Sequence, residues 1–409
     1  MDLPAIIYGG AALSTVYNDE DHLASDTPLR SVRLALRYIL ECSSYIFADC
    51  CLQRYGIRAF DTSPYYGSSE TVLGNILHVL RDEFPRSSYQ LVCVLDYARF
   101  FGTHFLFQIT KCGRFGPSTF DYSPPKIRQA VLRSLDQLKT DYLDAVYLHD
   151  VEFVCTPVAP KTTGNHATAL RQDAVSYGLG KGDEGTVRGE GDRQVLDAFQ
   201  ELQQLQRQGL VKKIGITGEV VNLKLSSTVY VISGYPLPTL LRLAILILHT
   251  PPGKPVDVVL SYSHLCLQNS TLMEFVPHFY DRAKVGQLIS ASPLSMGLLT
   301  SKPPSWHPAP RELRQAVIDA SRTWPGDFPN LAIGYSMSQS RLGEKLLPLV
   351  VGLSTPREVH EAVAVWRESE AGQSGEERRR GEECVREVIK NAGYLNWSWA
   401  SPNIQTLTK

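Results

Sequence analysis

The sequence predicts an α/β protein with a closed (β/α)8 barrel of the TIM-barrel type, formed by a single domain with insertions. Short apolar runs alternate with longer helical patterns along the chain. Several of the apolar runs are continuous, as expected for parallel strands that are covered on both faces. The chain has 409 residues, and a single core seldom grows beyond about 250–300 residues, so extra segments are expected outside the barrel.

Eight of the apolar runs are expected to be strands with helices between them. The expected strands are Ala5–Tyr8, Ile57–Asp61, Phe105–Thr110, Leu143–Leu148, Lys213–Ile216, Asp257–Leu260, Gln287–Ala291 and Leu349–Gly352. The expected helices are Glu70–Phe84, Pro124–Leu138, Gln194–Gln208, Pro238–Leu248, Thr271–Ala283 and Arg357–Trp366. In the second helix, Leu132, Leu135 and Leu138 recur at helical spacing. Eight strands alternating with helices favour a closed barrel. The alternative is an open doubly wound sheet, which is weakened because Gly9-Gly10 stands alone where GxGxxG would follow the first strand.

The composition is that of a globular protein, with 43% hydrophobic and 20% charged residues. The net charge of −1 gives no electrostatic reason to expect nucleic acid or an acidic membrane surface as a partner. No secretory signal is expected in Met1–Leu13, and the apolar stretch Leu237–Leu248 is shorter than the roughly 20 residues needed to cross a bilayer. The eight cysteines lack metal-ligand spacing. A cytoplasmic location is therefore expected.

Two regions do not fit the barrel pattern. Residues 162–192 are rich in glycine, serine, threonine and charge, and are expected to form a mobile loop after the fourth strand. Residues 368–383 carry interleaved acidic and basic side chains, as in a solvated helix or linker. The expected organisation is thus a barrel over residues 1–370, followed by a charged helix and tail over residues 371–409.

Polar side chains that could take part in a reaction lie at the ends of several expected strands. Asp61 ends one strand, and Tyr66 follows five positions later in a turn before a helix. Lys111, His149 and Ser292 end three further strands in the same way. Each of them alone is more often a cap, a surface lysine or a core histidine. Together, at successive strand ends of a barrel, they indicate a shared site, because catalytic groups lie at that face.

The order Asp61, Tyr66, Lys111 and His149 resembles the catalytic tetrad of the aldo-keto reductase superfamily. Within it, the chain resembles the branch that contains the D-arabinose 1-dehydrogenases and L-galactose dehydrogenases. The stretches that carry the resemblance are Phe60–Gly67, Ile109–Arg114, Asp257–His264, Ala291–Thr300 and Trp306–Ala309.

The resemblance implies oxidation of an aldose at C1 to the aldonolactone, with NAD as the hydride acceptor. Tyr66 would be the general base. A free tyrosine titrates near pH 10, and a neighbouring ammonium such as Lys111 would lower that pKa. Asp61 would hold Lys111, and His149 would orient the substrate. The alternatives are a general NADPH-dependent aldehyde reductase, a non-catalytic nucleotide-sensing subunit and a mis-spliced product. No metal is needed, and a monomer or weak homodimer is expected.

The resemblance also implies a dinucleotide across the barrel mouth. The residues implied to bind it are Ser233, Ser261, Ser292, Leu294, Met296, Gly297, Leu298, Gly352, Ser354, Thr355 and Arg357. Ser354 or Thr355 could instead cap a helix that has Pro356 in its first turn. Arg357 could accept a 2′-phosphate, so NADP is the alternative to NAD. Many relatives have Ser-Asn after the fifth strand and Gln at the end of the sixth, where this chain offers Ser233-Gly234 and Ser261.

Three segments lack counterparts in this pattern: residues 38–53, 92–108 and 218–231. Their removal rejoins stretches that read continuously like the family. The second segment can be encoded with a GT start and a CAG end, which are intron borders. The hypothesis is that the three segments are non-native insertions, retained short introns in the coding sequence. The alternative is genuine loop insertions.

Overall fold

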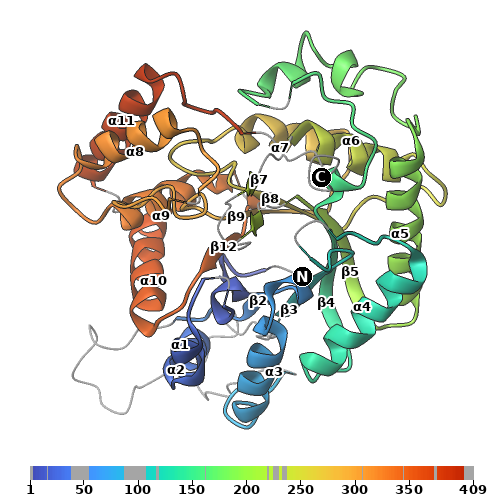
Figure 1. Cartoon of the computed structure of the whole chain (residues 1–409), viewed down its shortest axis with the longest axis horizontal. Helices are drawn as coiled ribbons and strands as arrows, with labels where there is room; N and C mark the ends of the chain where they lie inside the picture. The colour runs from blue at the N-terminus through green and yellow to red at the C-terminus, as the bar shows by residue number, and fades with distance from the viewer. Residues whose placement is uncertain are drawn as a thin grey trace, which may run out of the picture.

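The computed structural model describes residues 3–15, 17–37, 55–86, 107–116, 119–161, 163–218, 221–223, 230–232, 237–305, 307–343, 345–372 and 375–399. Within these residues, parallel strands close a barrel in the order β1-β12-β9-β8-β5-β4-β3-β2 (Figure 1). The barrel strands are β1 (Ile6–Gly9), β2 (Ala59–Asp61), β3 (Phe107–Cys112), β4 (Leu143–His149), β5 (Val211–Thr217), β8 (Val258–Tyr262), β9 (Gln287–Ala291) and β12 (Leu349–Gly352). The predicted barrel is confirmed, and each expected strand overlaps an observed one.

The strand register brings the carboxyl ends of β2, β3 and β4 to one face of the barrel. Asp61 on β2 pairs with Ile109, Lys111 on β3 pairs with Tyr147, and His149 on β4 pairs with Thr217. Parallel strands all end at the same face. The side chains of Asp61, Lys111 and His149 therefore start from neighbouring positions.

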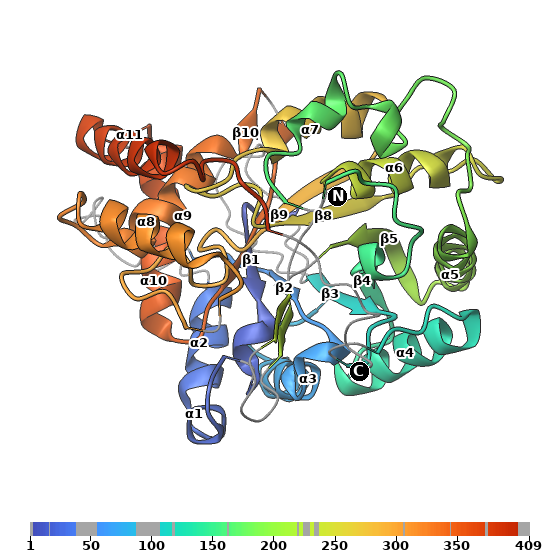
Figure 2. The same cartoon turned by 45° about the horizontal axis from the view of Figure 1, so that its top comes forward.

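A ring of helices surrounds the strands (Figures 1 and 2). The helices are α1 (Glu20–Ala24), α2 (Thr27–Leu36), α3 (Ser69–Val79), α4 (Pro124–Gln137), α5 (Glu190–Arg207), α6 (Leu237–Leu248), α7 (Leu272–Asp281), α8 (Arg311–Ser321), α9 (Phe328–Gln339), α10 (Pro356–Glu370) and α11 (Glu376–Asn391). In both views α8, α9 and α11 gather on one side of the barrel. Among the helices of the described residues, none is both long enough and apolar enough to cross a membrane.

Apolar side chains fill the barrel interior and the space between strands and helices. The interior contains Ile109, Tyr147 and Ile289. On α4, Ile127, Val131 and Leu135 face the strands. The stripe expected at Leu132, Leu135 and Leu138 was only partly right, because Leu132 is 47% exposed. The buried face of α4 follows a spacing of four residues, which keeps side chains on one side of a helix.

The two regions outside the barrel pattern pack against the rest of the chain. The segment expected to be a mobile loop carries the 3-10 helices η4 (Ala167–Leu170) and η5 (Val175–Tyr177), and buries Ala169, Tyr177 and Leu179 in the main core. The charged helix begins at Glu376, later than expected. Its apolar face buries Val385 and Ile389 against α8 and α9.

The three suspected insertions fall mostly outside the described residues. The first of them, residues 38–53, lies entirely outside the described residues. Of the second segment, Phe107 and Gln108 belong to β3, and residues 92–106 lie outside the described residues. Parts of the third segment form a two-stranded antiparallel hairpin of β6 (Val221–Leu223) and β7 (Tyr230–Ile232). A second hairpin, β10 (Arg341–Leu342) with β11 (Lys345–Leu346), precedes β12.

Candidate active site

The four residues of the predicted tetrad meet at the carboxyl face of the barrel. The Nζ of Lys111 donates to Asp61 Oδ1 over 2.6 Å and to the Thr62 carbonyl over 3.0 Å. The same ammonium lies 4.7 Å from the centroid of the Tyr66 ring. The Tyr66 ring stands at 88° to the ring of His149, with centroids 6.1 Å apart. The Lys111 side chain is only 1% exposed, so its charge acts on these partners with little screening.

A short turn after β2 sets the position of Tyr66. Ser63 caps the 3-10 helix η2 (Pro64–Tyr66), because its hydroxyl accepts from the Tyr65 N–H over 3.1 Å. Pro64 fixes the first backbone angle of that helix. Gly67 follows with φ of +60°, a value that glycine adopts readily. This turn ends η2 and lets α3 begin two residues later.

The hydroxyl of Ser63 also contacts a ring nitrogen of His149. Ser63 Oγ lies 3.1 Å from His149 Nδ1 and already accepts from the Tyr65 N–H. A serine hydroxyl can donate one hydrogen bond and accept two, so this contact fits either tautomer of the ring. In the tautomer with its proton on Nε2, His149 can donate from that nitrogen to an oxygen. The buried Tyr122 hydroxyl fixes the backbone by donating to the His149 carbonyl over 2.6 Å.

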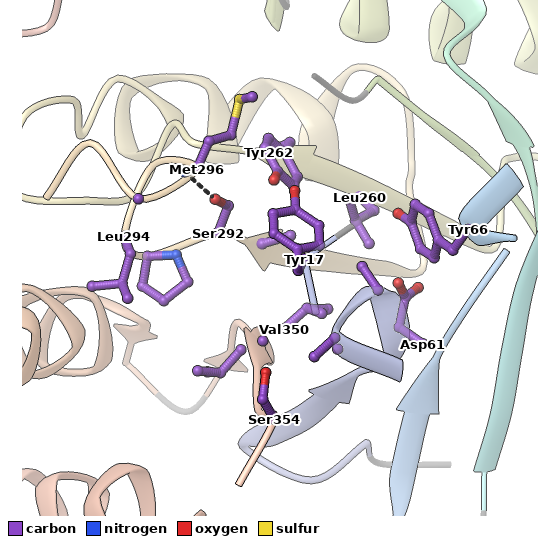
Figure 3. Close-up of a pocket in the computed structure, with 18 of the residues that line it drawn as sticks. Tyr17, Asp61, Tyr66, Leu260, Tyr262, Ser292, Leu294, Met296, Val350 and Ser354 are labelled. Atoms are coloured by element: carbon purple, nitrogen blue, oxygen red, sulfur yellow. Dashed lines mark hydrogen bonds between the residues drawn. The ribbon is translucent and has the colours of Figure 1, made fainter. Parts of the chain in front are cut away.

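A cavity of about 290 Å³ opens beside the tetrad. Figure 3 shows Tyr66 and Asp61 at one end, Leu294 and Met296 at the other, and Ser354 on a third side. The wall between them is largely apolar and comes from β1, β8, β9, β12 and their following turns. The lining residues are Gly9, Ala11, Ala12, Tyr17, Asp61, Tyr66, Lys111, Leu260, Tyr262, Ala291, Ser292, Pro293, Leu294, Met296, Gly297, Pro304, Val350, Val351, Gly352 and Ser354.

The model of the aldo/keto reductase family matches residues 43–372, which is more than half of the chain. The chain belongs to the aldo/keto reductase family. Aldo/keto reductases are oxidoreductases that use nicotinamide cofactors, typically NADPH.

Two curated relatives are similar over most of the chain. An L-galactose dehydrogenase from Arabidopsis thaliana is 30% identical over 403 residues, covering 97% of this chain and 94% of the relative. A D-arabinose 1-dehydrogenase from Saccharomyces cerevisiae is 32% identical over 359 residues, covering 87% and 80%. Among solved structures, a glycerol dehydrogenase from Gluconobacter oxydans matches with a TM-score of 0.53 and 15% identity, covering 97% of this chain and 94% of that chain. The structural match supports the barrel fold alone.

The lining of the cavity of this aldo/keto reductase is compatible with a nicotinamide cofactor. Its apolar lining includes Leu260, Ala291 and Val350. Hydroxyl groups of Ser292 and Ser354 also line it. Small-molecule sites are typically apolar with a few polar groups that fix orientation.

Six of the eleven residues predicted to bind the cofactor line this cavity: Ser292, Leu294, Met296, Gly297, Gly352 and Ser354. Leu298, Thr355 and Arg357 are absent from its lining. Leu298 is fully buried in the cluster that includes α8 and α9. Ser233 lies outside the described residues.

Ser261 also lies outside the lining of the cavity, as His149 does, so its role as a cofactor contact stays a prediction. Its hydroxyl is fully buried and lies 3.4 Å from His264 Nδ1. Its neighbours Leu260 and Tyr262 line the cavity instead. Successive side chains of a strand point to opposite faces, so Ser261 lies on the other face of β8 from Leu260 and Tyr262.

The turn after β9 places strained backbone at the cavity wall. Ser292, Ser295 and Met296 have φ values of 61°, 47° and 60°, in the left-handed region that non-glycine residues seldom adopt. The Ser292 hydroxyl accepts from the Met296 N–H over 2.9 Å and holds the turn closed. Such backbone clusters at functional sites and ligand clamps. The sequence motif predicted the location of this turn but not its conformation.

Thr355 and Arg357 lie at the start of α10, and both interact with residues of that helix. Thr355 caps the helix, and the Glu358 carboxylate accepts from the backbone N–H groups of Ser354 and Thr355 over 2.6 and 3.0 Å. Arg357 pairs with Glu361 at 2.7 Å and is 81% exposed. The capping interpretation of this motif is therefore correct for Thr355.

Sequence reasoning missed two aromatic residues of the site, Tyr17 and Tyr262. Tyr17 lies in the loop between η1 (Gly10–Leu13) and α1, and Tyr262 ends β8. Both line the cavity, and their hydroxyl ends point toward one another in Figure 3. The only signal in the sequence was the position of Tyr262 at a strand end, one residue after Ser261.

Proposed function

We propose that this chain oxidises an aldose at C1 to the aldonolactone and passes the hydride to NAD, with Tyr66 as the general base. The observation that carries the proposal is the buried Lys111 ammonium between the Asp61 carboxylate and the Tyr66 ring. The names of the two curated relatives, L-galactose dehydrogenase and D-arabinose 1-dehydrogenase, support an aldose as substrate.

The proton chemistry follows from the charge next to Tyr66. A phenolate is stabilised by a nearby cation, and the effect is strong in a buried site with weak screening. Asp61 holds the Lys111 ammonium in place over 2.6 Å, so its direction is fixed before the substrate arrives. Tyr66 then accepts the proton of the C1 hydroxyl as the carbonyl forms.

His149 orients the substrate in this proposal. With its proton on Nε2, the neutral ring donates a hydrogen bond to the substrate oxygen. The 3.1 Å contact of Ser63 to Nδ1 is compatible with that tautomer. A fixed donor at the reacting oxygen positions the C1–H bond for transfer.

The bound cofactor supplies the hydride acceptor. Ser292, Leu294, Met296, Gly297 and Ser354 would hold it along the cavity wall. The start of α10 favours NAD, because the Glu358 carboxylate already occupies the backbone N–H groups that would attract a 2′-phosphate. The guanidinium of Arg357 is engaged by Glu361.

A substrate panel tests the proposal. The chain is assayed with D-arabinose, L-galactose and L-fucose using NAD or NADP, and with simple aldehydes using NADPH. Faster reduction of NAD by at least one aldose is expected. Turnover limited to aldehydes with NADPH would contradict the aldose proposal and favour a general aldehyde reductase. Bound cofactor without turnover would favour a non-catalytic role.

A further inference from the structure

The end of the described chain forms a strap, residues 394–399, which lies against loops at the carboxyl face of the barrel. After α11 the chain runs back toward the barrel strands (Figures 1 and 2). Ser398 pairs with Gly164, in the long loop after β4, through two backbone hydrogen bonds of 2.8 and 3.0 Å. The Ser398 hydroxyl accepts from Asn269 Nδ2 over 3.1 Å, in the loop after β8. The strap therefore joins two loops that follow barrel strands.

Gln268, in the loop after β8, holds the strap at three further points. Its side-chain Nε2 donates to the Tyr394 carbonyl over 2.7 Å and to the Trp397 carbonyl over 2.9 Å. Its backbone carbonyl accepts from the Asn396 N–H over 2.9 Å. Because the strap is bonded along its length, the position of its last side chain, Trp399, is set by the loops beneath it.

Trp399 packs against a buried histidine, His307, which lies between β9 and α8. The two ring centroids are 5.1 Å apart, and the rings stand at 83° to one another. His307 Nδ1 accepts from the Ala309 N–H over 3.0 Å, so the ring proton is on Nε2. Nε2 lies 2.9 Å from the Ser295 carbonyl oxygen and donates to it, since a carbonyl can only accept.

Ser295 begins the strained part of the turn after β9. Ser295, Met296 and Gly297 have successive φ values of 47°, 60° and 82°. Met296 and Gly297 line the cavity, and Figure 3 shows Met296 at the end away from Tyr66. Non-glycine residues keep such a backbone only where the surrounding structure holds it. The hydrogen bond from His307 to the Ser295 carbonyl is one of the contacts that hold this turn.

We propose that Trp399 and His307 are positioning residues for the nicotinamide cofactor, because the strap holds His307 in place and His307 holds the turn that lines the cavity. The inference rests on the proposed function, in which Met296 and Gly297 hold the cofactor. Trp399 and His307 are both absent from the lining of the described cavity, so they act on the cofactor through the turn. A turn that is already held in its bound shape loses less conformational freedom when the ligand binds, which strengthens binding.

The first test compares two amides at position 307. His307→Asn can still accept from the Ala309 N–H, but its side chain does not reach the Ser295 carbonyl. His307→Gln is one carbon longer and places an amide N–H near the position of Nε2.

Isothermal titration calorimetry of the wild-type chain with NAD and with NADP identifies the tighter cofactor, and the variants are titrated with that one. His307→Asn is expected to raise its Kd about 10-fold, and His307→Gln less than about 3-fold, as for the loss and the recovery of one hydrogen bond. An unchanged Kd in His307→Asn, or the same rise in both variants, would overturn the proposal.

The second test removes the ring that packs against His307. Trp399→Ala is expected to raise the Kd of the cofactor about 5-fold. The matched control is Trp397→Ala in the same strap, because the Trp397 ring packs against Tyr394, with centroids 5.5 Å apart. The control should change the Kd less than about 2-fold.

Hydrogen–deuterium exchange of residues 292–299 gives a readout that needs no cofactor. Exchange in this turn should become faster in Trp399→Ala than in Trp397→Ala, because the turn loses a support. Equal exchange in the two variants would contradict the proposed route. The variants at 307 and at 399 are independent, so either set decides the proposal if the other does not fold.

A double variant tests whether the two residues act in series. If Trp399 acts through His307, adding Trp399→Ala to His307→Asn raises the Kd by less than about 2-fold. A rise equal to the product of the two single effects would overturn the proposal. The single-turnover rate at saturating cofactor should change less than the Kd does in every variant, because the tetrad is untouched.

These measurements separate the inference from the proposed function. If the wild-type chain binds NAD or NADP but oxidises no aldose, the aldose assignment fails, and the Kd values of the variants still decide the inference. If the wild-type chain oxidises an aldose and the variants bind the cofactor as it does, the inference alone fails.

Discussion

The 2.6 Å hydrogen bond from Lys111 Nζ to Asp61 Oδ1 joins the ends of two adjacent barrel strands inside a buried site. Neither side chain is more than 6% exposed. Removing one member of a buried ion pair leaves an uncompensated charge and is strongly destabilising. This hydrogen bond holds the Lys111 ammonium beside the Tyr66 ring, at 4.7 Å from its centroid.

Ser63→Ala is expected to lower kcat about 10-fold with a smaller effect on KM, because the ring of His149 loses its partner at Nδ1. Steady-state kinetics with the preferred aldose measure it. The matched control is Ser69→Ala, a buried serine nearby that bonds to Thr62 and to the Gly10 carbonyl. If both variants lose the same activity, Ser63 acts through packing and not through His149.

Glu358→Gln is expected to raise the ratio of kcat/KM with NADP to kcat/KM with NAD about 5-fold, because a negative charge leaves the start of α10. It should also destabilise the fold by about 1 kcal/mol through the weakened capping box. The exposed Glu377 on α11 provides the control Glu377→Gln. An unchanged ratio in Glu358→Gln would show that this carboxylate does not select the cofactor.

His307 should make stability depend on pH. Burial lowers its pKa to about 4, and its Nδ1 accepts from the Ala309 N–H over 3.0 Å, which requires the neutral ring. The unfolded chain takes up a proton near pH 6.5, so between about pH 6.5 and 4 the unfolded state binds more protons and stability falls as pH falls.

In His307→Gln that slope should be shallower by up to about 1.4 kcal/mol per pH unit. Urea unfolding at several pH values between 4 and 7 measures it. Burial also lowers the pKa of His166 to about 4 and raises that of Glu382 to about 7. Because Glu382 acts in the opposite direction, variants are compared with the parent, and the exposed His78→Gln is the control. Equal slopes for His307→Gln and the parent would contradict the account.

The mature transcript is expected to lack the sequence for residues 38–53, for the second segment and for residues 218–231. Sequencing the message decides this. Phe107 and Gln108 belong to the second segment and also to β3. The position at which the message is spliced therefore shows whether the mature protein keeps these two residues. A message that encodes all three segments would show that they are genuine insertions.

The strand pattern and the tetrad could be predicted from the sequence because both depend on local features. Buried parallel strands are continuous apolar runs, and a polar residue at the end of each run lies at one face of the barrel. That reasoning located Asp61, Lys111 and His149 together with Tyr66. The resemblance, and not this reasoning, implied Ser261, whose side chain lies on the opposite face of β8 from Leu260 and Tyr262.

Other parts of the site depend on contacts between distant segments. Tyr17 reaches the cavity from the loop after η1, and Arg114 meets Asp150 across two strand ends. Arg357 looked like a cofactor ligand, but its partner Glu361 lies one turn further along the same helix. Helical spacing could have predicted the Arg357–Glu361 pair, but no periodicity predicts the positions of Tyr17 and Arg114, which depend on how loops fold over the barrel mouth.

The most direct test of the account is the single-turnover rate of aldose oxidation by Tyr66→Phe with saturating NAD, measured beside its Kd for NAD. The account predicts a rate at least about 10³-fold below wild type, since phenylalanine keeps the ring but cannot accept the proton, and a Kd within about 2-fold. A Tyr66→Phe variant that retains the wild-type rate would contradict the assignment of Tyr66 as the base.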